Sequence, residues 1–218
     1  MKKGIIMGAI ILAAVVGIIC IANSKTDPYK DMDADSIIES SEVTGSIGEK
    51  IVGNPTDAKI IVYEYADFGC SHCADWNRKI NNLIEKYDGK IALVFRSYDI
   101  GQFKNSLKAA SAATAAQIQG YFKEYKDLLY SNQTEWFYED GADLTEILSN
   151  YFNEASKGTG DLNKFKEDMK SDPVRARLRF EQNMGKKVDL AGTPTFRING
   201  ETINISELEK TIEELVAK

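Results

Sequence analysis

The feature that most constrains the fold of this chain is an apolar run, residues 60–68, that leads directly into Cys70-Ser71-His72-Cys73. β-Branched and aromatic residues without polar alternation are typical of a strand buried on both faces of a sheet. After Gly69, the apolar side chains of residues 73–84 recur near helical spacing. The Cys-x-x-Cys sequence is therefore expected at the junction between a central strand and a helix.

Two cysteines at the start of a helix indicate thiol chemistry. The free backbone N–H groups and the positive end of the helix dipole favour a negative charge there, and a thiolate supplies one. Cys70, at the helix start, is the candidate nucleophile, and Cys73, one turn inward, is expected to resolve a mixed disulfide. A purely structural disulfide is the alternative, although closing so short a loop removes little entropy from the unfolded chain.

The rest of the chain predicts further strands and a block of helices. A strand is expected at 91–98, and a short edge strand within 46–52. Residues 195–203 are expected to form a hairpin with a type I′ turn at Asn199-Gly200. Strand, helix and strand in succession imply a parallel pair joined by a right-handed crossover. Helices are expected at 105–118, 121–130, 143–156, 161–170, 174–186 and from Ser206 to Val216, with cap signals at Asp143 and Glu146, at Asp172-Pro173, and at Ser206 and Glu209.

The order of strand, Cys70-Ser71-His72-Cys73, helix and a distant Gly192-Thr193-Pro194-Thr195 resembles the thioredoxin fold, and more narrowly the DsbA-like thiol–disulfide oxidoreductases. Residues 53–55, 119–122, 127–130 and 199–200 are also similar to that family's pattern. The resemblance implies an α/β thioredoxin fold over residues 50–218, with a helical subdomain inserted at about 102–187.

The resemblance also implies roles for residues around the cysteines. The family has a histidine before the second cysteine, as His72 here, but a proline where this chain has Ser71. An adjacent cation or donor lowers a thiol pKa, so His72 is expected to activate Cys70. Glu64 matches an acidic residue beneath the inner cysteine, where it would act as general base for Cys73. Arg96, in the neighbouring strand, is a candidate counter-ion for Glu64.

Thr193 and Pro194 are expected to form part of the substrate site. By resemblance, the Thr193-Pro194 peptide bond is cis and lies against the active-site sulfurs. The backbone of Thr193 would then hold an extended substrate by strand addition. Together with Ser71, these are the expected substrate-binding residues, and no metal ligand is expected. Phe68 and Trp76 flank the cysteines as possible apolar contacts, whereas Trp136, Phe137 and Tyr138 are assigned to the core of the insertion.

The N-terminal residues predict a membrane anchor. Lys2 and Lys3 precede an uncharged stretch, 4–22, long enough to cross a hydrocarbon layer of about 30 Å. Residues 1–22 are therefore expected to be a cytoplasmic start and a transmembrane helix, with the domain outside the cytoplasm and residues 23–49 as a mostly solvated tether. A cleaved signal peptide is the alternative. Cys20 is expected to be a buried apolar residue of the span rather than a lipid attachment site.

These features predict a single-pass membrane protein whose extracytoplasmic domain donates the Cys70–Cys73 disulfide to reduced or unfolded secreted proteins. The resemblance implies no organic cofactor and a quinone-coupled membrane reoxidase, DsbB-like or similar to vitamin-K-epoxide reductase (VKOR-like). The net charge of −6, without a basic stripe, argues against nucleic acid as a partner.

Three other functions remain open from the sequence. The same Cys-x-x-Cys fits a disulfide reductase or isomerase. Cys70, His72 and Cys73 are soft ligands that would suit a copper or zinc carrier, although they do not complete a four-ligand site. A redox-silent, chaperone-like binding module is the last alternative.

Overall fold

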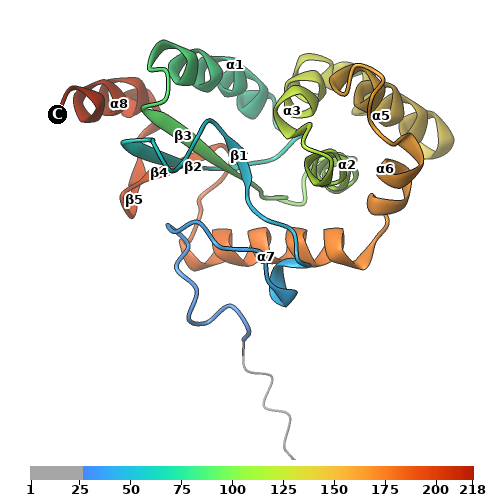
Figure 1. Ribbon diagram of the computed structural model, residues 1–218, viewed down its shortest axis with the longest axis horizontal. Coiled ribbons are helices and arrows are strands. Elements are labelled where there is room, and N and C mark those ends of the chain that lie inside the picture. Colours follow the sequence, from blue (N-terminus) through green and yellow to red (C-terminus); the bar gives the residue numbers. More distant parts are fainter. Residues whose placement is uncertain (1–26) are drawn as a thin grey trace, which may run out of the picture.

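The structure, a computed structural model, describes residues 27–218 as one five-stranded sheet with helices on both faces (Figure 1). The strands are β1 (Lys50–Val52), β2 (Ile60–Ala66), β3 (Ile91–Ser97), β4 (Thr195–Ile198) and β5 (Glu201–Ile203). The α-helices are α1 (Ser71–Lys86), α2 (Ser106–Ile118), α3 (Phe122–Ser131), α4 (Gln133–Trp136), α5 (Gly141–Ala155), α6 (Leu162–Asp168), α7 (Asp172–Lys187) and α8 (Leu208–Ala217), with 3₁₀ turns η1 (Glu42–Thr44) and η2 (Ile205–Glu207).

Strand β2 lies at the centre of the sheet, whose order is β1-β3-β2-β4-β5. It pairs in parallel with β3 and antiparallel with β4, and β1 forms one edge as predicted. Asn199 and Gly200 both have positive φ angles, 52° and 83°, which a type I′ turn requires. The predicted hairpin is therefore confirmed.

The two faces of the sheet bury different sets of side chains, because successive residues of a strand point to opposite sides. Helices α1 and α8 cover one face and α7 covers the other (Figure 1). Val62, Leu93 and Phe95 belong to the core on the α1 side. Tyr63, Tyr65 and Val94 pack with Phe180 and Met184 on the α7 side.

The helical insertion is confirmed, but the structure divides it. Helices α2 to α6 form a lobe beside the sheet, whereas α7 runs beneath the sheet and leads into β4 (Figure 1). The crossover is thus made by α7 itself, and the added subdomain is α2 to α6. The short helix α4 was not predicted, and three caps lie elsewhere: α5 begins after Asp140, α7 after Ser171 and α8 after Glu207.

The segment before β1 differs from the solvated tether expected for residues 23–49. The carbonyl oxygen of Ala34 accepts hydrogen bonds from Arg96 and Tyr65, and Asp35 forms an ion pair with Arg197 at 2.7 Å. Within this segment, Glu49 is buried against the domain. Asp35 and Glu49 therefore neutralise Arg197 and Arg96 of the sheet, and through these contacts residues 27–49 pack onto the domain as its N-terminal strap.

None of the helices within residues 27–218 has the length and apolar character needed to cross a bilayer. The span predicted at 4–22, including Cys20, lies outside the described residues.

Candidate active site

The turn between β2 and α1 is organised by Asp67. Its carboxylate accepts hydrogen bonds from the backbone N–H of Gly69 at 2.8 Å, from that of Ile100 at 3.1 Å, and from the Ser106 hydroxyl. Gly69 is needed because a Cβ atom there would lie 2.4 Å from the Cβ of Phe103. This turn ends at Cys70, the N-cap of α1, so the predicted strand-to-helix junction is confirmed.

Cys70 and Cys73 are both free thiols, so the structure corresponds to the dithiol form. Cys70 retains 5% of its exposed surface, whereas Cys73 retains none. The Sγ of Cys70 donates to the carbonyl oxygen of Thr193 at 3.4 Å. Of the two sulfurs, only that of Cys70 is open to a partner molecule.

The pKa values of the two thiols move in opposite directions. Hydrogen bonding from the Cys73 thiol has the largest effect on the Cys70 pKa, and it lowers that pKa. The backbone N–H groups of Cys73 and His72 and the Thr193 side chain lower it further. Together they outweigh the effect of burial, and the Cys70 pKa is about 6. Burial, followed by the interaction with Cys70, raises the Cys73 pKa. At neutral pH the pair therefore holds one thiolate, on Cys70, and one thiol.

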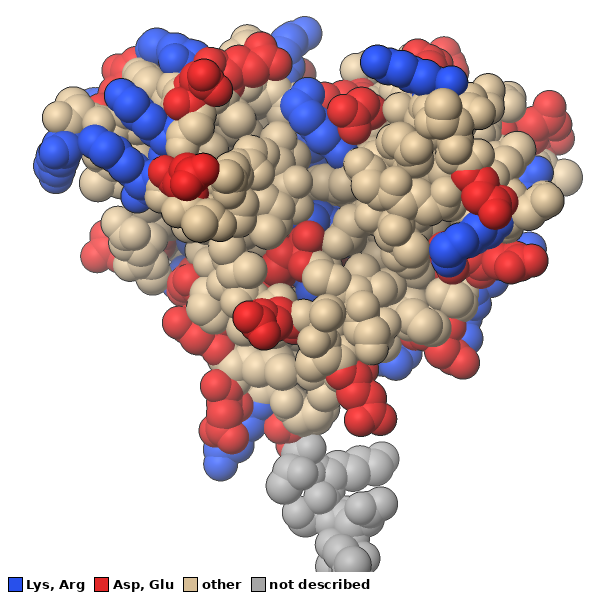
Figure 2. Space-filling view, in the orientation of Figure 1, with Lys and Arg blue, Asp and Glu red and all other residues tan. Residues whose placement is uncertain are grey.

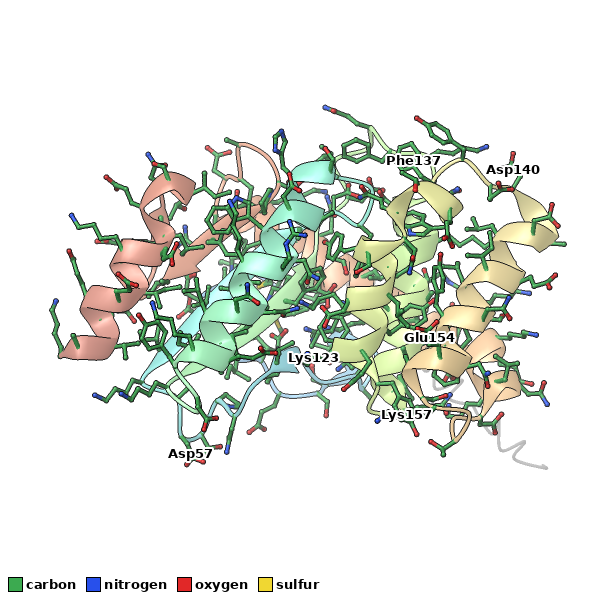
Figure 3. The ribbon with its side chains drawn as sticks, turned by 90° about the horizontal axis from the view of Figure 1, so that it is seen from above. Asp57, Lys123, Phe137, Asp140, Glu154 and Lys157 are labelled. Atoms are coloured by element: carbon green, nitrogen blue, oxygen red, sulfur yellow. The ribbon has the colours of Figure 1, made fainter. Side chains whose placement is uncertain are left out.

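His72 and Ser71 occupy the first turn of α1 with exposed side chains. The backbone N–H of His72 is one of the groups that lower the Cys70 pKa. Ser71 lines a hollow of about 260 Å³ together with Phe103, Phe137 and Tyr138. In Figure 3, Phe137 lies at the same end of the molecule as the beginning of α1.

These aromatic side chains correct two expectations. Trp136 is fully buried, as predicted for the insertion core, but Tyr138 is 76% exposed and stacks edge-on against Phe137. Phe68 is 1% exposed, so it is a core residue rather than an apolar contact for substrates. Trp76 is half-buried and packs against Phe196.

Glu64 lies on the α1 side of β2 and is 1% exposed. Its two carboxylate oxygens have no hydrogen-bond partner within residues 27–218. Burial raises its pKa to about 7, while the Lys126 ammonium lowers it and Asp127 raises it. The charge of Glu64 in turn contributes to the raised pKa of Cys73.

Arg96 is not the counter-ion of Glu64. In the register of the sheet Glu64 pairs with Phe95, and Arg96 pairs with Tyr65, so the two charged side chains point to opposite faces. Arg96 donates to Glu49 at 2.8 Å on the α7 side. The cation that acts on Glu64 is Lys126, from the inserted helix α3.

Sequence reasoning missed the roles of Asp67 and Lys126. A signal for Lys126 exists, since it stands four residues from both Phe122 and Tyr130 and thus on the apolar face of its helix. Asp67 follows a buried strand two residues before a glycine, a pattern typical of an Asx turn.

The Thr193-Pro194 peptide bond is cis, as predicted. The bond precedes β4, and the Thr193 carbonyl oxygen faces Cys70. The Thr193 hydroxyl is buried and forms no hydrogen bond of ordinary geometry in the described part of the chain, but it lies close enough to Cys70 to lower the pKa of that thiol. Within residues 27–218, no three His, Cys, Asp or Glu side chains are grouped as metal ligands would be.

Comparison with known proteins agrees with this geometry. The thioredoxin family model, described as "Thioredoxin", matches residues 46–218. The probable disulfide bond formation protein D of Bacillus anthracis is 28% identical over 229 residues, covering 100% of this chain and 97% of that protein. Oxidised BdbD of Bacillus subtilis has a similar fold, with a TM-score of 0.66 at 20% identity over 84% of this chain and 100% of that one. The thiol–disulfide exchange protein alpha-DsbA2 of Wolbachia pipientis has a TM-score of 0.63 at 22% identity, over 77% of this chain and 87% of that one.

The fold and the unequal thiol pair define a thiol–disulfide exchange protein. The chain belongs to the thioredoxin family, and within it is a DsbA-like thiol–disulfide oxidoreductase.

Proposed function

We propose that this oxidoreductase works outside the cytoplasm as a thiol oxidase that donates a Cys70–Cys73 disulfide to reduced secreted proteins. The observation that carries the proposal is the position of Cys70, at the N-cap of α1 and beside the buried Cys73 thiol, where its thiolate is stabilised and its pKa is lowered to about 6. A stabilised thiolate favours the reduced pair and so makes the disulfide a stronger oxidant. The relatives named for disulfide bond formation support the same direction.

The reaction proceeds by two exchanges. A client thiolate attacks Sγ of Cys70, the Cys70–Cys73 bond breaks, and Cys73 leaves with a proton from the Glu64 carboxyl. A second client thiolate then attacks the client sulfur of the mixed disulfide, and Cys70 leaves as the thiolate. The client gains one disulfide and loses two electrons, which remain on the cysteine pair.

Reoxidation reverses the roles of the two sulfurs. The Cys70 thiolate attacks a disulfide of a membrane oxidant, and Cys73 then gives its proton to Glu64 and attacks Cys70. The enzyme disulfide forms, and the oxidant leaves as a dithiol. A buried carboxyl with a pKa of about 7 suits both tasks, since it donates or accepts a proton near neutral pH.

Two surfaces beside Cys70 suit an extended polypeptide client. The backbone of Thr193 is placed to pair with it by strand addition, with Pro194 fixing that loop. On the other side, Ser71 and the aromatic hollow of Phe137 and Tyr138 offer apolar contact to a neighbouring client side chain. His72, exposed between them, would contact the client or assist Cys70.

Oxidation of a dithiol peptide tests the proposal. The oxidised protein should transfer its disulfide to the peptide, and the equilibrium with glutathione should favour the reduced protein. The Cys73→Ala variant should retain clients as mixed disulfides on Cys70. Failure to oxidise the peptide, with an unactivated Cys70 thiol, would contradict the proposal, while a strongly reducing equilibrium would favour the reductase or isomerase alternative.

Membrane anchoring through residues 4–22 and a DsbB-like or VKOR-like reoxidase are part of the proposal. The uncharged N-terminal stretch supports the first, and the class of the enzyme supports the second. Fractionation of cells, with protease added outside intact membranes, tests the anchor. The full chain should sediment with membranes and lose its domain to the protease, and recovery in the soluble fraction would contradict it.

A further inference from the structure

A groove between α2 and α7 has an apolar floor. Leu107, in the first turn of α2, is 57% exposed, and it lines the groove together with Met169 and Leu178. The groove has a volume of about 470 Å³, within the range of about 300–1,000 Å³ that is common for binding clefts. In Figure 1, α2 lies directly above α7. An exposed apolar side chain over a cleft of this size is typical of a docking surface.

The groove begins at the edge of the sheet that carries Cys70. Its lining includes Asp99 and Gly101, which follow β3. Strand β3 is parallel to β2, the strand before Cys70, so the carboxyl ends of both strands lie at the same edge. The backbone N–H of Ile100 donates to the carboxylate of Asp67 in the turn before Cys70. The near end of the groove is thus fixed to the active-site turn.

Phe103 and Leu107 connect the groove with the hollow beside Ser71. They stand four positions apart around the N-terminus of α2, and Phe103 lines the hollow while Leu107 lines the groove. Between them, the Ser106 hydroxyl accepts a hydrogen bond from the backbone N–H of Gly69 at 3.1 Å. An extended client attached to the nucleophilic sulfur can therefore cross Phe103 and continue into the groove.

Two arginines of α7 make one part of the groove positive. Arg175 and Arg179, one turn apart, are exposed and line the groove. Arg175 also pairs with Asp172, whereas no ion pair within residues 27–218 involves Arg179. Of the described lining only Asp99 is acidic, and its backbone binds Gln182, seven residues after Arg175 on α7. Since guanidinium groups bind carboxylates well, an acidic side chain of the occupant is favoured at Arg179.

The charge of the whole protein does not favour an acidic client. The net charge is −6. Figure 2 shows acidic and basic side chains interspersed on the face that it views, without a stripe of one sign. The long-range field of the protein therefore works against an acidic segment. Only local contacts, such as those with Arg179, can select one.

We propose that the groove between α2 and α7 binds the part of an extended client beyond the hollow and selects an apolar residue next to an acidic one. The apolar side chain lies against Leu107 and Leu178, and the carboxylate binds Arg179. The inference rests on the proposed function, because the client is held at Cys70. Contacts so far from the reacting sulfurs strengthen binding without changing the rate of exchange in the bound complex.

The test compares dithiol peptides that share one pair of cysteines and differ only in a tail. After a glycine–serine spacer of varied length, at either terminus, the tail carries leucine and glutamate, leucine and lysine, or two serines. The full chain is oxidised and held in nanodiscs of phosphatidylcholine, whose headgroup has no net charge. Disulfide transfer in a single turnover, measured over a range of peptide concentrations, gives a half-saturation concentration and a limiting rate.

The leucine–glutamate tail should lower the half-saturation concentration by about tenfold relative to the serine tail, from one buried apolar side chain and one partly exposed ion pair. The limiting rate should be the same for all tails. The preference for glutamate over lysine should weaken as salt is added.

Two variants locate the contacts. Arg179→Gln should abolish the preference for glutamate over lysine, and Leu107→Ser should abolish the preference for leucine over serine. Each variant is compared with itself on two tails, so a general change of activity cancels. Lys186→Gln is the control for the first, since Lys186 is an exposed cation of α7 outside the lining. Ile37→Ser, which changes an exposed apolar residue of the strap, is the control for the second.

Equal half-saturation concentrations for all tails would overturn the proposal, and so would a glutamate preference that persists in Arg179→Gln. A dimer of the unmodified protein that dissociates in Leu107→Ser would show that a second copy covers the groove, and would overturn it as well. These results leave the oxidase function intact. If the unmodified protein fails to oxidise the peptide without a tail, the proposed function itself fails.

Discussion

The carbonyl oxygen of Thr193 accepts a hydrogen bond from Sγ of Cys70 at 3.4 Å. The residues are 123 positions apart, and the contact joins the N-cap of α1 to the loop before β4. When Cys70 is ionised this donor is lost, and the sulfur is stabilised by the Cys73 thiol first, then by the backbone N–H groups of α1 and the Thr193 side chain. The carbonyl oxygen of Thr193 therefore holds the thiol, whereas other groups favour the thiolate.

The acidity of Cys70 should depend on Cys73. Because hydrogen bonding from the Cys73 thiol is the largest cause of the low pKa, Cys73→Ala should raise the Cys70 pKa from about 6 toward the ordinary value. Ultraviolet absorbance of the thiolate, measured across a pH titration, reports the change. Cys70→Ser should show no transition near pH 6, since Cys73 has a raised pKa, and an unshifted titration in Cys73→Ala would contradict this assignment.

The stability of the reduced protein should rise with pH through the Cys70 transition. Between the folded pKa of about 6 and the unfolded value near 9.0, the native state binds fewer protons than the unfolded chain, so this stabilisation is lost as pH falls through about 6. Glu64 has the opposite effect on stability. Its pKa is raised to about 7, so its contribution to the free energy of unfolding is greatest at low pH and is lost as pH rises through about 7.

Comparison with Cys70→Ser cancels the contribution of Glu64, which is present in both proteins. Urea unfolding of the reduced proteins at about pH 5 and about pH 8 measures the difference. The unmodified protein should gain more stability over this interval than Cys70→Ser does. An equal change in both would show that the thiolate contributes nothing to stability.

Local signals in the sequence were sufficient to predict β2 and the N-terminus of α1, whereas the cis Thr193-Pro194 bond was predicted from the family resemblance. The face of the sheet to which each strand residue points could not be predicted in the same way, because the register between strands decides it. Arg96 pairs with Tyr65 rather than with Glu64, so the Arg96 side chain points to the face opposite that of Glu64. Lys126 was missed for a related reason, because its partners on α1 lie 45 and 49 positions away in the chain.

The packing of the strap onto the domain could not be predicted from composition either. Its acidic residues are typical of a solvated segment, yet Asp35 and Glu49 bind arginines that come from distant strands. Only the folded sheet brings those arginines together. The helices of the insertion other than α4, by contrast, follow from their local sequence and are found within two residues of the ranges predicted for them.

Gly69 should not tolerate a side chain. A Cβ atom there would lie 2.4 Å from Cβ of Phe103 and 2.5 Å from the Ser106 hydroxyl. Gly69→Ala should therefore destabilise the protein by about 1–3 kcal/mol, as overpacking does, and slow peptide oxidation by moving the turn before Cys70. Gly48→Ala is the control, because nothing lies within 4 Å of its added Cβ. Equal stability and activity of the two variants would contradict the tight packing at Gly69.

The strap should depend on a buried ion network on the α7 side of the sheet. Glu181 accepts from Lys50 at 2.6 Å, from Arg177 at 2.9 Å and from the backbone N–H of Ser97 at 2.9 Å. Arg177 also binds Glu49, which pairs with Arg96. Every charged side chain in this network is fully buried, so each charge relies on its partners.

Replacing Glu181 by Gln should lower the free energy of unfolding by about 3–5 kcal/mol, because it leaves the buried charge of Lys50 without a carboxylate and removes one of the two carboxylates that Arg177 binds. Glu213→Gln removes a carboxylate of the same type from the exposed pair with Lys86 and should change the stability little. Urea unfolding of both variants measures the contrast. If Glu181→Gln unfolds at the same midpoint as Glu213→Gln, the buried network does not hold β1 and the strap to α7.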